Sequence, residues 1–207
     1  MKFYFLVVIF ISTYLNASNI KLIDEKYANK MLGLTYHKEC PVSLDELRIV
    51  NVKYLGFDNN IYLGDIIVHK DLAFEVFEIF KELFEISYAI KQIIPIEKYN
   101  GDDFASIEAD NTSAFNCRKA EGSQKYSKHS YGKAIDLNPL ENPYVYSNGT
   151  TSHEASQKYL IRKSNDDSIE NKAVLTSSSK AVQIFKKYGW KWGGDWKNIK
   201  DYQHFQK

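Results

Sequence analysis

Apolar and polar residues alternate from Glu46 to Tyr54, a pattern that puts every second side chain on one face of a strand. The tetrad 57–60, with its Asp-Asn-Asn run, interrupts the pattern and is typical of a turn. The apolar pattern resumes from Ile61 to Val68. The sequence therefore predicts a β-hairpin over these residues.

A helical period replaces the alternation from Asp71 to Ser87. Apolar residues recur on one face of the expected α-helix, and glutamates occupy another face. The apolar set is Leu72, Val76, Phe80 and Leu83, and the acidic set is Glu75, Glu78, Glu82 and Glu85. We predict an amphipathic helix here, and we interpret its acidic face as solvated rather than as a functional site.

Shorter patterns fill the rest of the chain. Residues 90–96 predict another apolar strand, and a polar stretch follows from Glu97 to Asp110. Thr176 to Ser179 can begin a helix that Gly189 ends. The segment 140–172 is rich in Asn, Ser and charged residues, and we expect it to leave the sheet and shape one wall of a cleft. Together these elements predict a mixed α+β domain with a small antiparallel sheet flanked by helices.

The first residues have the pattern of a secretory signal. Met1 and Lys2 precede an apolar run from Phe3 to Leu15, and the small residues Ala17 and Ser18 follow it. The run is shorter than the roughly 20 residues that a membrane-spanning helix needs. We therefore predict a cleaved signal peptide over 1–17, a mature domain over 18–207, a periplasmic or secreted location and no stable membrane insertion. An uncleaved anchor and a buried first strand are the alternatives.

Length, charge and cysteine content limit the number of domains and the class of protein. A chain of 207 residues suits one domain, and its 27 basic and 26 acidic residues leave no excess charge to attract a nucleic acid. The two cysteines, Cys40 and Cys117, can pair in an oxidising compartment or stay as separate buried thiols. The sequence does not decide between these two states, because it does not give the distance between the Cα atoms.

Two polar clusters contain the candidate chemistry. The first holds His129 and Asp136, with Gly132 between them to let the chain turn back; the second holds Asp201 and His204 near the C-terminus. Positions three apart on a straight strand point to opposite faces, so a shared site requires a bend between Asp201 and His204. Two imidazoles and a carboxylate suit tetrahedral zinc and leave its fourth position open to water, whose proton a second carboxylate can take.

An isolated histidine is more often an ordinary core or surface residue than a metal ligand, and the chain contains five histidines. We assign His37, His69 and His153 to that ordinary group. Among these three, His153 is the residue that we consider as an exception, that is, as a functional histidine, because it lies in the polar segment 140–172.

The two clusters also carry a family resemblance. The segment Ser-Lys-His-Ser-Tyr-Gly-Lys-Ala-Ile-Asp at 127–136, with Leu-Asn-Pro and Asn-Pro-Tyr after it, resembles the first zinc motif of the D-alanyl-D-alanine carboxypeptidase family of bacterial cell-wall peptidases. The tail, with Gly-Trp-Lys-Trp-Gly-Gly-Asp-Trp and Asp-Tyr-Gln-His-Phe, resembles its second. The branch that includes L-alanyl-D-glutamate endopeptidases is the most similar. The resemblance extends upstream through 111–118 and the predicted hairpin, and it implies a fold like that of hedgehog domains and these peptidases.

The resemblance implies a role for each matching residue. His129, Asp136 and His204 would be the zinc ligands, Asp201 the general base and Arg118 the group that stabilises the oxyanion. Many relatives have Glu at the position of Asp201; the Asp is shared with the endopeptidase-like branch. A surface salt bridge is the alternative role of Arg118. We also expect Ser127 and Trp192 to contact substrate, although Ser127 can instead cap a turn and the tryptophans at 190, 192 and 196 can belong to the core. Asp195 can hold a histidine or satisfy the Gly-Gly turn.

The implied substrates are the stem peptides of peptidoglycan, cut by a monomer with Zn²⁺ as its cofactor. We favour a D-alanyl-D-alanine carboxypeptidase, with an L-alanyl-D-glutamate endopeptidase as the alternative. A non-catalytic, hedgehog-like zinc-binding interaction domain is the alternative from another class, because a fold and a metal do not by themselves establish turnover.

Overall fold

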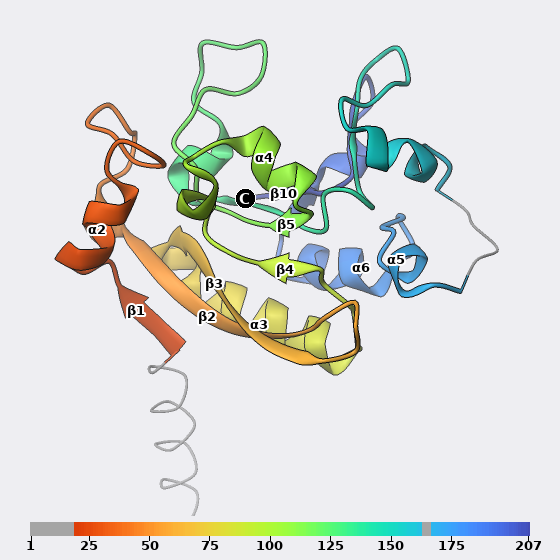
Figure 1. The fold of residues 1–207 in the computed structure, drawn as a ribbon, viewed down its shortest axis with the longest axis horizontal. Helices are drawn as coiled ribbons and strands as arrows, with labels where there is room; N and C mark the ends of the chain where they lie inside the picture. Colours follow the sequence, from red (N-terminus) through yellow and green to blue (C-terminus); the bar gives the residue numbers. More distant parts are fainter. Residues whose placement is uncertain (1–18, 163–166) are drawn as a thin grey trace, which may run out of the picture.

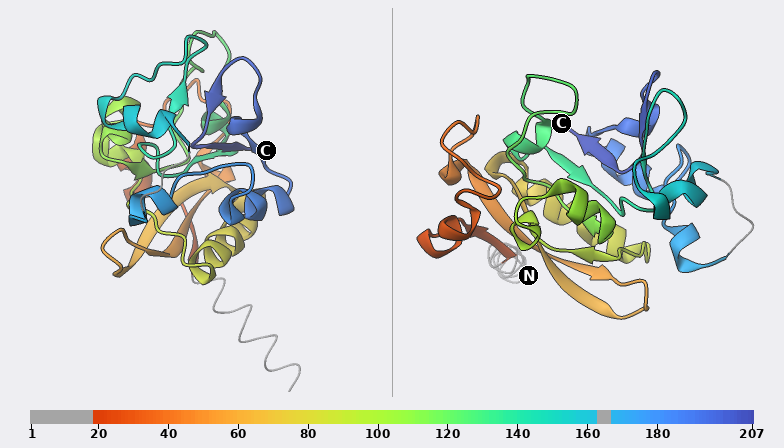
Figure 2. Two further views of the ribbon diagram at one scale, coloured as in Figure 1. Left: turned by 90° about the vertical axis from the view of Figure 1, so that its right-hand side faces the viewer. Right: turned by 45° about the horizontal axis from the view of Figure 1, so that its top comes forward.

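The computed structural model describes residues 19–162 and 167–207, so the predicted signal peptide at 1–17 lies outside the described residues. Mixed helices and short sheets confirm the α+β class. The strands do not form the one small sheet that we predicted, however. They are divided among small sheets of two or three strands each. In Figures 1 and 2 the predicted hairpin and the helix that follows it form one layer, and most of the later elements lie above it in the view of Figure 1.

The predicted hairpin is confirmed. Strand β2 (Leu47–Leu55) pairs antiparallel with β3 (Ile61–His69) along its whole length, and the short β1 (Ile20–Leu22) pairs with the other edge of β2. The predicted amphipathic helix is also confirmed as α3 (Ala73–Glu85), preceded by a 3-10 turn at Lys70–Leu72. Its apolar residues Val76, Phe80 and Leu83 are buried in the same core as β2 and β3, so burial of this face holds the helix on the sheet.

The acidic face of α3 is only partly solvated, which corrects our interpretation. Glu75 accepts hydrogen bonds from the indole N–H of Trp190 and from the ammonium group of Lys207. Glu82 likewise accepts from Lys187 and from the hydroxyl group of Tyr188. These bonds attach the C-terminal part of the chain to α3, a contact that sequence periodicity does not reveal.

The second sheet contains the C-terminus of the chain. Strand β10 (His204–Gln206) lies between β6 (Ala134–Asp136) and β8 (Lys191–Trp192), antiparallel to both. Helix α6 (Lys180–Lys187) packs beside it, with Phe185 stacked on Phe205 at a centroid distance of 3.9 Å. The helix starts after Ser179 and ends before Gly189, as predicted.

The middle of the chain departs most from expectation. The strand predicted at 90–96 shortens to β4 (Gln92–Ile93), paired parallel with β5 (Asn111–Thr112), because Pro95 and a 3-10 helix at Ile96–Tyr99 follow it. The polar stretch contains α4 (Asp103–Glu108). The segment 140–172 holds β7 (Tyr144–Val145), which pairs with β9 (Lys200–Asp201), then a 3-10 helix at Glu154–Leu160 and α5 (Ile169–Lys172).

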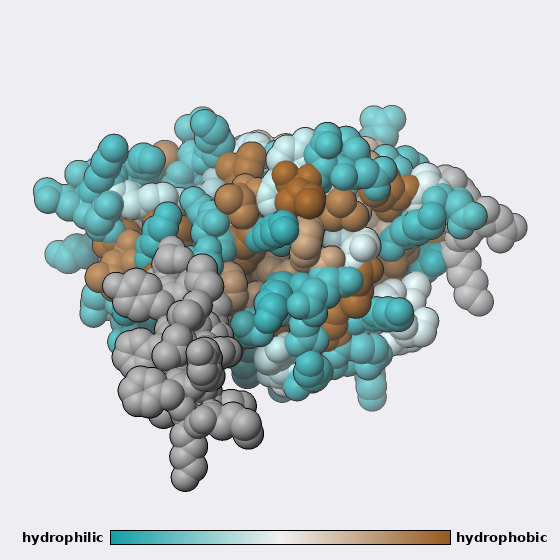
Figure 3. Space-filling model, turned by 90° about the horizontal axis from the view of Figure 1, so that it is seen from below, coloured by the Kyte–Doolittle hydropathy of each residue, from teal (hydrophilic) through white to brown (hydrophobic). Residues whose placement is uncertain are grey.

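Within residues 19–162 and 167–207, no helix is long and apolar enough to cross a membrane. Seen from below, the surface is mainly polar, and apolar side chains form separate patches on it (Figure 3). The exposed large apolar residues include Ile61, Leu63 and Phe74.

Candidate active site

Three buried side chains from distant parts of the sequence meet at one end of the β6–β10 pair. His129 lies in a 3-10 helix (Lys128–Tyr131), and Gly132, with a φ of 63°, turns the chain from that helix towards β6. Asp136 is the last residue of β6, and His204 is the first residue of β10. The antiparallel register places His204 directly opposite Asp136. The bend that a shared site requires after Asp201 is present at residues 202–203.

The facing atoms of these side chains are close to one another. Nε2 of His129 lies 3.2 Å from Nδ1 of His204 and 3.1 Å from a carboxylate oxygen of Asp136, whose other oxygen lies 3.0 Å from Nδ1 of His204. Bonds of 2.0–2.2 Å to a tetrahedral ion would put its ligand atoms about 3.3–3.6 Å apart. The observed spacing therefore fits one small cation held by all three side chains.

Hydrogen bonds behind the cluster fix which nitrogen of each ring faces it. Nδ1 of His129 donates to the carbonyl oxygen of Ala114, and Nε2 of His204 donates to Oε1 of Gln206. In the neutral rings, Nε2 of His129 and Nδ1 of His204 then carry lone pairs that point at each other and at the Asp136 carboxylate. Three electron-pair donors in contact repel unless a proton or a cation lies between them, so the arrangement is suited to a metal ion.

The charges in the cluster reinforce one another. Burial alone would raise the pKa of Asp136, but when the rings carry protons in place of a metal ion, attraction to His129 and hydrogen bonds from both histidines outweigh it and hold that pKa far below its usual range. Burial lowers the pKa of His204, but its hydrogen bond to Asp136 and the charges of Asp136 and Asp201 raise it to about 9. An anion thus stabilises positive charge at this point, which is the electrostatic condition for cation binding.

Asp201 is the second carboxylate of the site. It is the last residue of β9, and its Oδ1 is buried without a hydrogen-bond partner in the described part of the chain. Burial raises the pKa of Asp201 to about 6, partly offset by the charge of His204. Gly193 packs against its backbone so closely that a Cβ there would collide with the Asp201 carbonyl oxygen. A carboxylate with a pKa near neutrality can both accept and return a proton.

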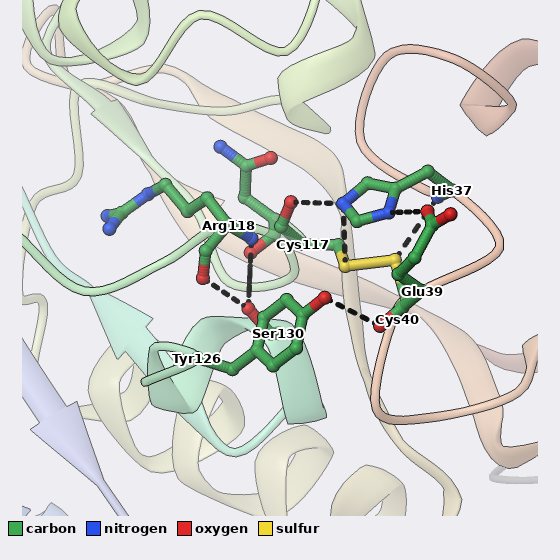
Figure 4. Close-up of a disulfide and its surroundings, with 8 residues drawn as sticks. His37, Glu39, Cys40, Cys117, Arg118, Tyr126 and Ser130 are labelled. Atoms are coloured by element: carbon green, nitrogen blue, oxygen red, sulfur yellow. Dashed lines mark hydrogen bonds and ion pairs between the residues drawn. A yellow bond between two sulfur atoms is a disulfide. The ribbon is translucent and has the colours of Figure 1, made fainter. Parts of the chain in front are cut away.

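Arg118 reaches the site from the segment after the disulfide. Its guanidinium group forms an ion pair with Asp103 of α4 at 2.6 Å, while its Nε is buried without a partner among the described residues. The position of Arg118 is therefore compatible with both predicted roles, oxyanion stabilisation and a salt bridge, because the ion pair with Asp103 holds the side chain at the cavity. The preceding residue, Cys117, is bonded to Cys40 with the Cα atoms 5.8 Å apart, so the cysteines form a disulfide and are not separate thiols. Figure 4 shows this disulfide and the hydrogen bonds of Ser130 to Arg118.

These residues line an open cavity of about 590 Å³. His129, Asp136, Asp201, His204 and Arg118 all contribute to its wall, together with Ser127. The Ser127 hydroxyl also accepts a hydrogen bond from the His129 amide, so this residue caps the turn as well as lining the cavity. Residues 144, 146 and 151–153 form part of the wall, so the polar segment 140–172 does shape the cleft.

Two predicted residues lie elsewhere. Trp192 is 3 % exposed in the core, where its indole N–H donates to the carbonyl oxygen of Tyr202, and it does not line the cavity. The tryptophan that lines the cavity is Trp196. Asp195 contacts neither a histidine nor the cavity; its carboxylate pairs with Lys186 on the surface.

Sequence reasoning missed several features of the site. Gln206 and the Ala114 carbonyl group orient the two imidazoles, and Tyr144 and Tyr146 line the cavity. The position of Gln206, two residues after His204 on the same face of a strand, was a signal that could have identified it. The Ala114 carbonyl group left no signal, because any residue type supplies a backbone acceptor.

The fold and the site together define an α+β domain with a candidate metal centre beside a buried carboxylate, an arrangement suited to hydrolysis. Residues 121–207 match the family described as D-alanyl-D-alanine carboxypeptidase. The matched segment includes both motifs with His129, Asp136, Asp201 and His204, and it begins after Arg118. It confirms the family resemblance of the two motifs and supports a peptidase of the D-alanyl-D-alanine carboxypeptidase type. No solved structure matches the chain.

Proposed function

We propose that this protein is a zinc-dependent peptidase that hydrolyses peptidoglycan stem peptides, with D-alanyl-D-alanine carboxypeptidase as its activity. One observation carries the proposal: three buried donors that are suited to a single cation face the same cavity as the buried carboxylate of Asp201. The family match to 121–207 supports the peptidase class. The zinc dependence and the identity of the cleaved bond go beyond the family match and are part of our proposal.

The donor set favours zinc among the common ions. Calcium and magnesium prefer shells made of oxygen atoms, whereas two imidazole nitrogens with one carboxylate are a common zinc set. When bound, zinc would lower the pKa of a water molecule at its open position to near neutrality. His129, Asp136 and His204 would hold the ion, and Gln206 and the Ala114 carbonyl group would keep the two rings oriented.

The other residues of the site have roles that follow from their chemistry. Asp201, buried and with a raised pKa, would take the proton of the attacking water and pass it to the leaving amine. Arg118, held by Asp103 at the cavity wall, would stabilise the negative charge that develops on the oxygen of the cleaved carbonyl group. Ser127 also lines the cavity and can contact the substrate.

A carboxypeptidase also needs a cationic group for the free carboxylate of its substrate. The side chains of Lys119 and Lys128 line the same cavity, and neither pairs with a carboxylate in the described part of the chain. This supply of positive charge favours the carboxypeptidase over the endopeptidase. The Cys40–Cys117 disulfide supports a periplasmic or secreted location, because such bonds persist in oxidising compartments.

Digestion of purified muropeptides with the zinc-loaded protein, followed by mass spectrometry of the products, tests the proposal. We expect the wild type to release a single D-alanine from pentapeptide stems, and Asp201→Ala to bind zinc but lose cleavage. Asp195→Ala is the matched control, because Asp195 is a nearby aspartate outside the cavity, and this variant should cleave as the wild type does.

The other outcomes are distinct. Release of a disaccharide-alanine fragment would assign the L-alanyl-D-glutamate endopeptidase instead. Zinc binding without cleavage by the wild type would favour a binding domain on the same scaffold. Full activity after removal of all zinc by a chelator would refute the metal dependence.

A further inference from the structure

The Cys40–Cys117 disulfide lies against a third group with the chemistry of a metal ligand, the imidazole of His37 (Figure 4). Nε2 of His37 lies 3.3 Å from Sγ of Cys117, and the backbone amide of His37 donates a hydrogen bond to Sγ of Cys40 at 3.1 Å. A ring nitrogen and both sulfur atoms lie within 4.8 Å of one another. These three side chains do not line the cavity of the candidate active site, so the cluster is separate from it.

Glu39 sets the direction of the lone pair on His37. Its carboxylate accepts a hydrogen bond from Nδ1 of His37 at 2.9 Å, and this bond lowers the pKa of Glu39, so the carboxylate is ionised at neutral pH. In the neutral ring Nδ1 then carries the proton, and Nε2 carries a lone pair that points towards Cys117. A carboxylate on the outer nitrogen of the ring is a common support of a metal-bound histidine.

The disulfide offers this lone pair no donor. Nε2 lies 3.3 Å from both Sγ and the carbonyl oxygen of Cys117, and both of these atoms are acceptors. A reduced Cys117 would instead offer an S–H proton to the ring, and its thiolate could share a metal ion with it. The neutral ring of His37 is therefore better matched to the reduced cysteine pair than to the disulfide.

Contacts other than the S–S bond hold the two segments of the cluster together. The amide of Cys117 donates a hydrogen bond to the carbonyl oxygen of Thr35 at 3.0 Å. The hydroxyl group of Tyr126 donates one to the carbonyl oxygen of Glu39 at 2.6 Å. Because these bonds do not involve sulfur, we expect them to keep the three side chains close to one another after reduction.

The cluster has the donor set of a zinc site. Two thiolates and an imidazole are common zinc ligands, whereas calcium and magnesium prefer oxygen atoms. The two thiolates would balance the charge of Zn²⁺, so no further charged ligand is needed. The side chain of His37 is 42 % exposed, so water can reach a fourth position on the ion.

We propose that His37, Cys40 and Cys117 form a second metal site, which binds zinc when the disulfide is reduced. A dithiol gives two electrons and two protons to the S–S bond and is itself oxidised to a disulfide, which leaves a thiol on each cysteine. Zinc then displaces the two thiol protons and binds both thiolates and Nε2 of His37. The S–S bond or one zinc ion can thus join the same two segments of the chain. The inference does not depend on the proposed function.

Cobalt is a probe that reports this site alone. The chain contains no other cysteine, and Co²⁺ bound to thiolate gives a charge-transfer band in the near ultraviolet. We expect the reduced protein, freed of dithiol under anaerobic conditions, to show this band with Co²⁺ and to lose it when Zn²⁺ is added. The oxidised protein should show no such band. With zinc alone, the reduced protein should retain one more ion per chain than the oxidised protein, whatever the active site holds.

Two variants test the assigned roles. Glu39→Ala keeps all three ligands and should weaken zinc binding to the reduced protein by about 10–100-fold, as the loss of an outer hydrogen bond to a ligand imidazole does. His37→Leu removes a ligand and should weaken binding more than Glu39→Ala does. His69→Leu is the matched control, because His69 belongs to neither metal cluster, and it should leave the affinity unchanged.

Several results would overturn the inference. One is a reduced protein that shows no thiolate band or holds no more zinc than the oxidised protein. Another is an extra ion that His37→Leu binds as tightly as the wild type, because the two thiols alone would then hold it. If reduction unfolds the chain, zinc should restore its near-ultraviolet circular dichroism, and failure to do so would also overturn the site. A protein that cleaves no stem peptide would refute the proposed function and leave this site untouched.

Discussion

The hydroxyl group of Ser130 donates a hydrogen bond to the carbonyl oxygen of Arg118 at 2.7 Å and accepts one from the amide of Arg118 at 2.9 Å. Ser130 follows His129 in the chain, and Arg118 follows the disulfide-bonded Cys117. The disulfide, the cavity arginine and the first candidate metal ligand are therefore joined through adjacent backbone groups.

The disulfide should contribute substantially to stability. It joins cysteines 77 residues apart, for which the chain-entropy relation gives about 4.5 kcal/mol of stabilisation against the reduced chain. We expect a reductant to lower the thermal unfolding midpoint and the free energy of unfolding measured in urea. The variant with both Cys40→Ser and Cys117→Ser should start from the lower stability and show no response to the reductant. Equal stability of the oxidised and reduced wild type would contradict this prediction.

Gln206 should tune metal affinity without being a ligand. Replacement by Leu removes the acceptor that orients His204, and the loss of such an outer hydrogen bond typically weakens metal binding by about 10–100-fold. Competition with a fluorescent zinc chelator would measure the change. Gln183→Leu on α6 is the control, because the side chain of Gln183 donates a hydrogen bond to the Ser177 carbonyl group on the surface, and the affinity should be unchanged there. An unchanged affinity in Gln206→Leu would show that other contacts fix the ring.

Gly193 should be required for the position of Asp201. A methyl group at 193 would collide with the Asp201 backbone, so Gly193→Ala should displace the carboxylate and lower kcat while all three candidate ligands stay intact. Zinc content should remain near one ion per chain. The matched variant Gly122→Ala meets no atom within 4 Å of the added Cβ, although its φ of 65° makes the backbone strained, and it should retain activity. Loss of zinc together with activity in Gly193→Ala would point to a wider disruption.

The buried acid pair of Asp110 and Glu141 should make stability depend on pH. Burial, and then the charge of Asp110, raises the pKa of Glu141 to about 9 from an ordinary value of 4.5. The folded chain therefore holds a proton that the unfolded chain releases, so this contribution to stability is complete below pH 4.5 and is lost as pH rises through about 9. Glu141→Gln should be more resistant to unfolding than the wild type at pH 9, and the difference should shrink towards pH 5. Urea midpoints at several pH values would measure it, and a constant difference would contradict the assignment.

The hairpin and α3 were predictable because each is long enough to show a period. Strand β2 alternates over nine residues, and α3 repeats its apolar face over thirteen. The sheet that carries the site was not predictable in the same way. Its strands have two or three residues each, too few to show alternation, and their pairing joins positions far apart in the sequence.

The candidate ligands could be found from sequence because each motif keeps its residues together, whereas their surroundings could not. The run Gly-Trp-Lys-Trp-Gly-Gly-Asp-Trp does not show which tryptophan faces the cavity. The pairing of Trp192 with Phe205 across β8 and β10 buries that side chain and leaves Trp196 at the cavity. In the same way, His153 is hydrogen-bonded to Glu108, 45 residues earlier, and no local sequence pattern connects the two residues.

The central place of β10 has a consequence for biosynthesis. This strand completes a sheet whose other two strands come earlier in the chain, and its pairing with β6 brings His204 to Asp136. A growing polypeptide cannot assemble the three-donor cluster until residues 204–206 have been translated and have left the ribosome. A nascent chain that stops before His204 would hold two of the three donors, and a zinc-dependent activity would be absent from it.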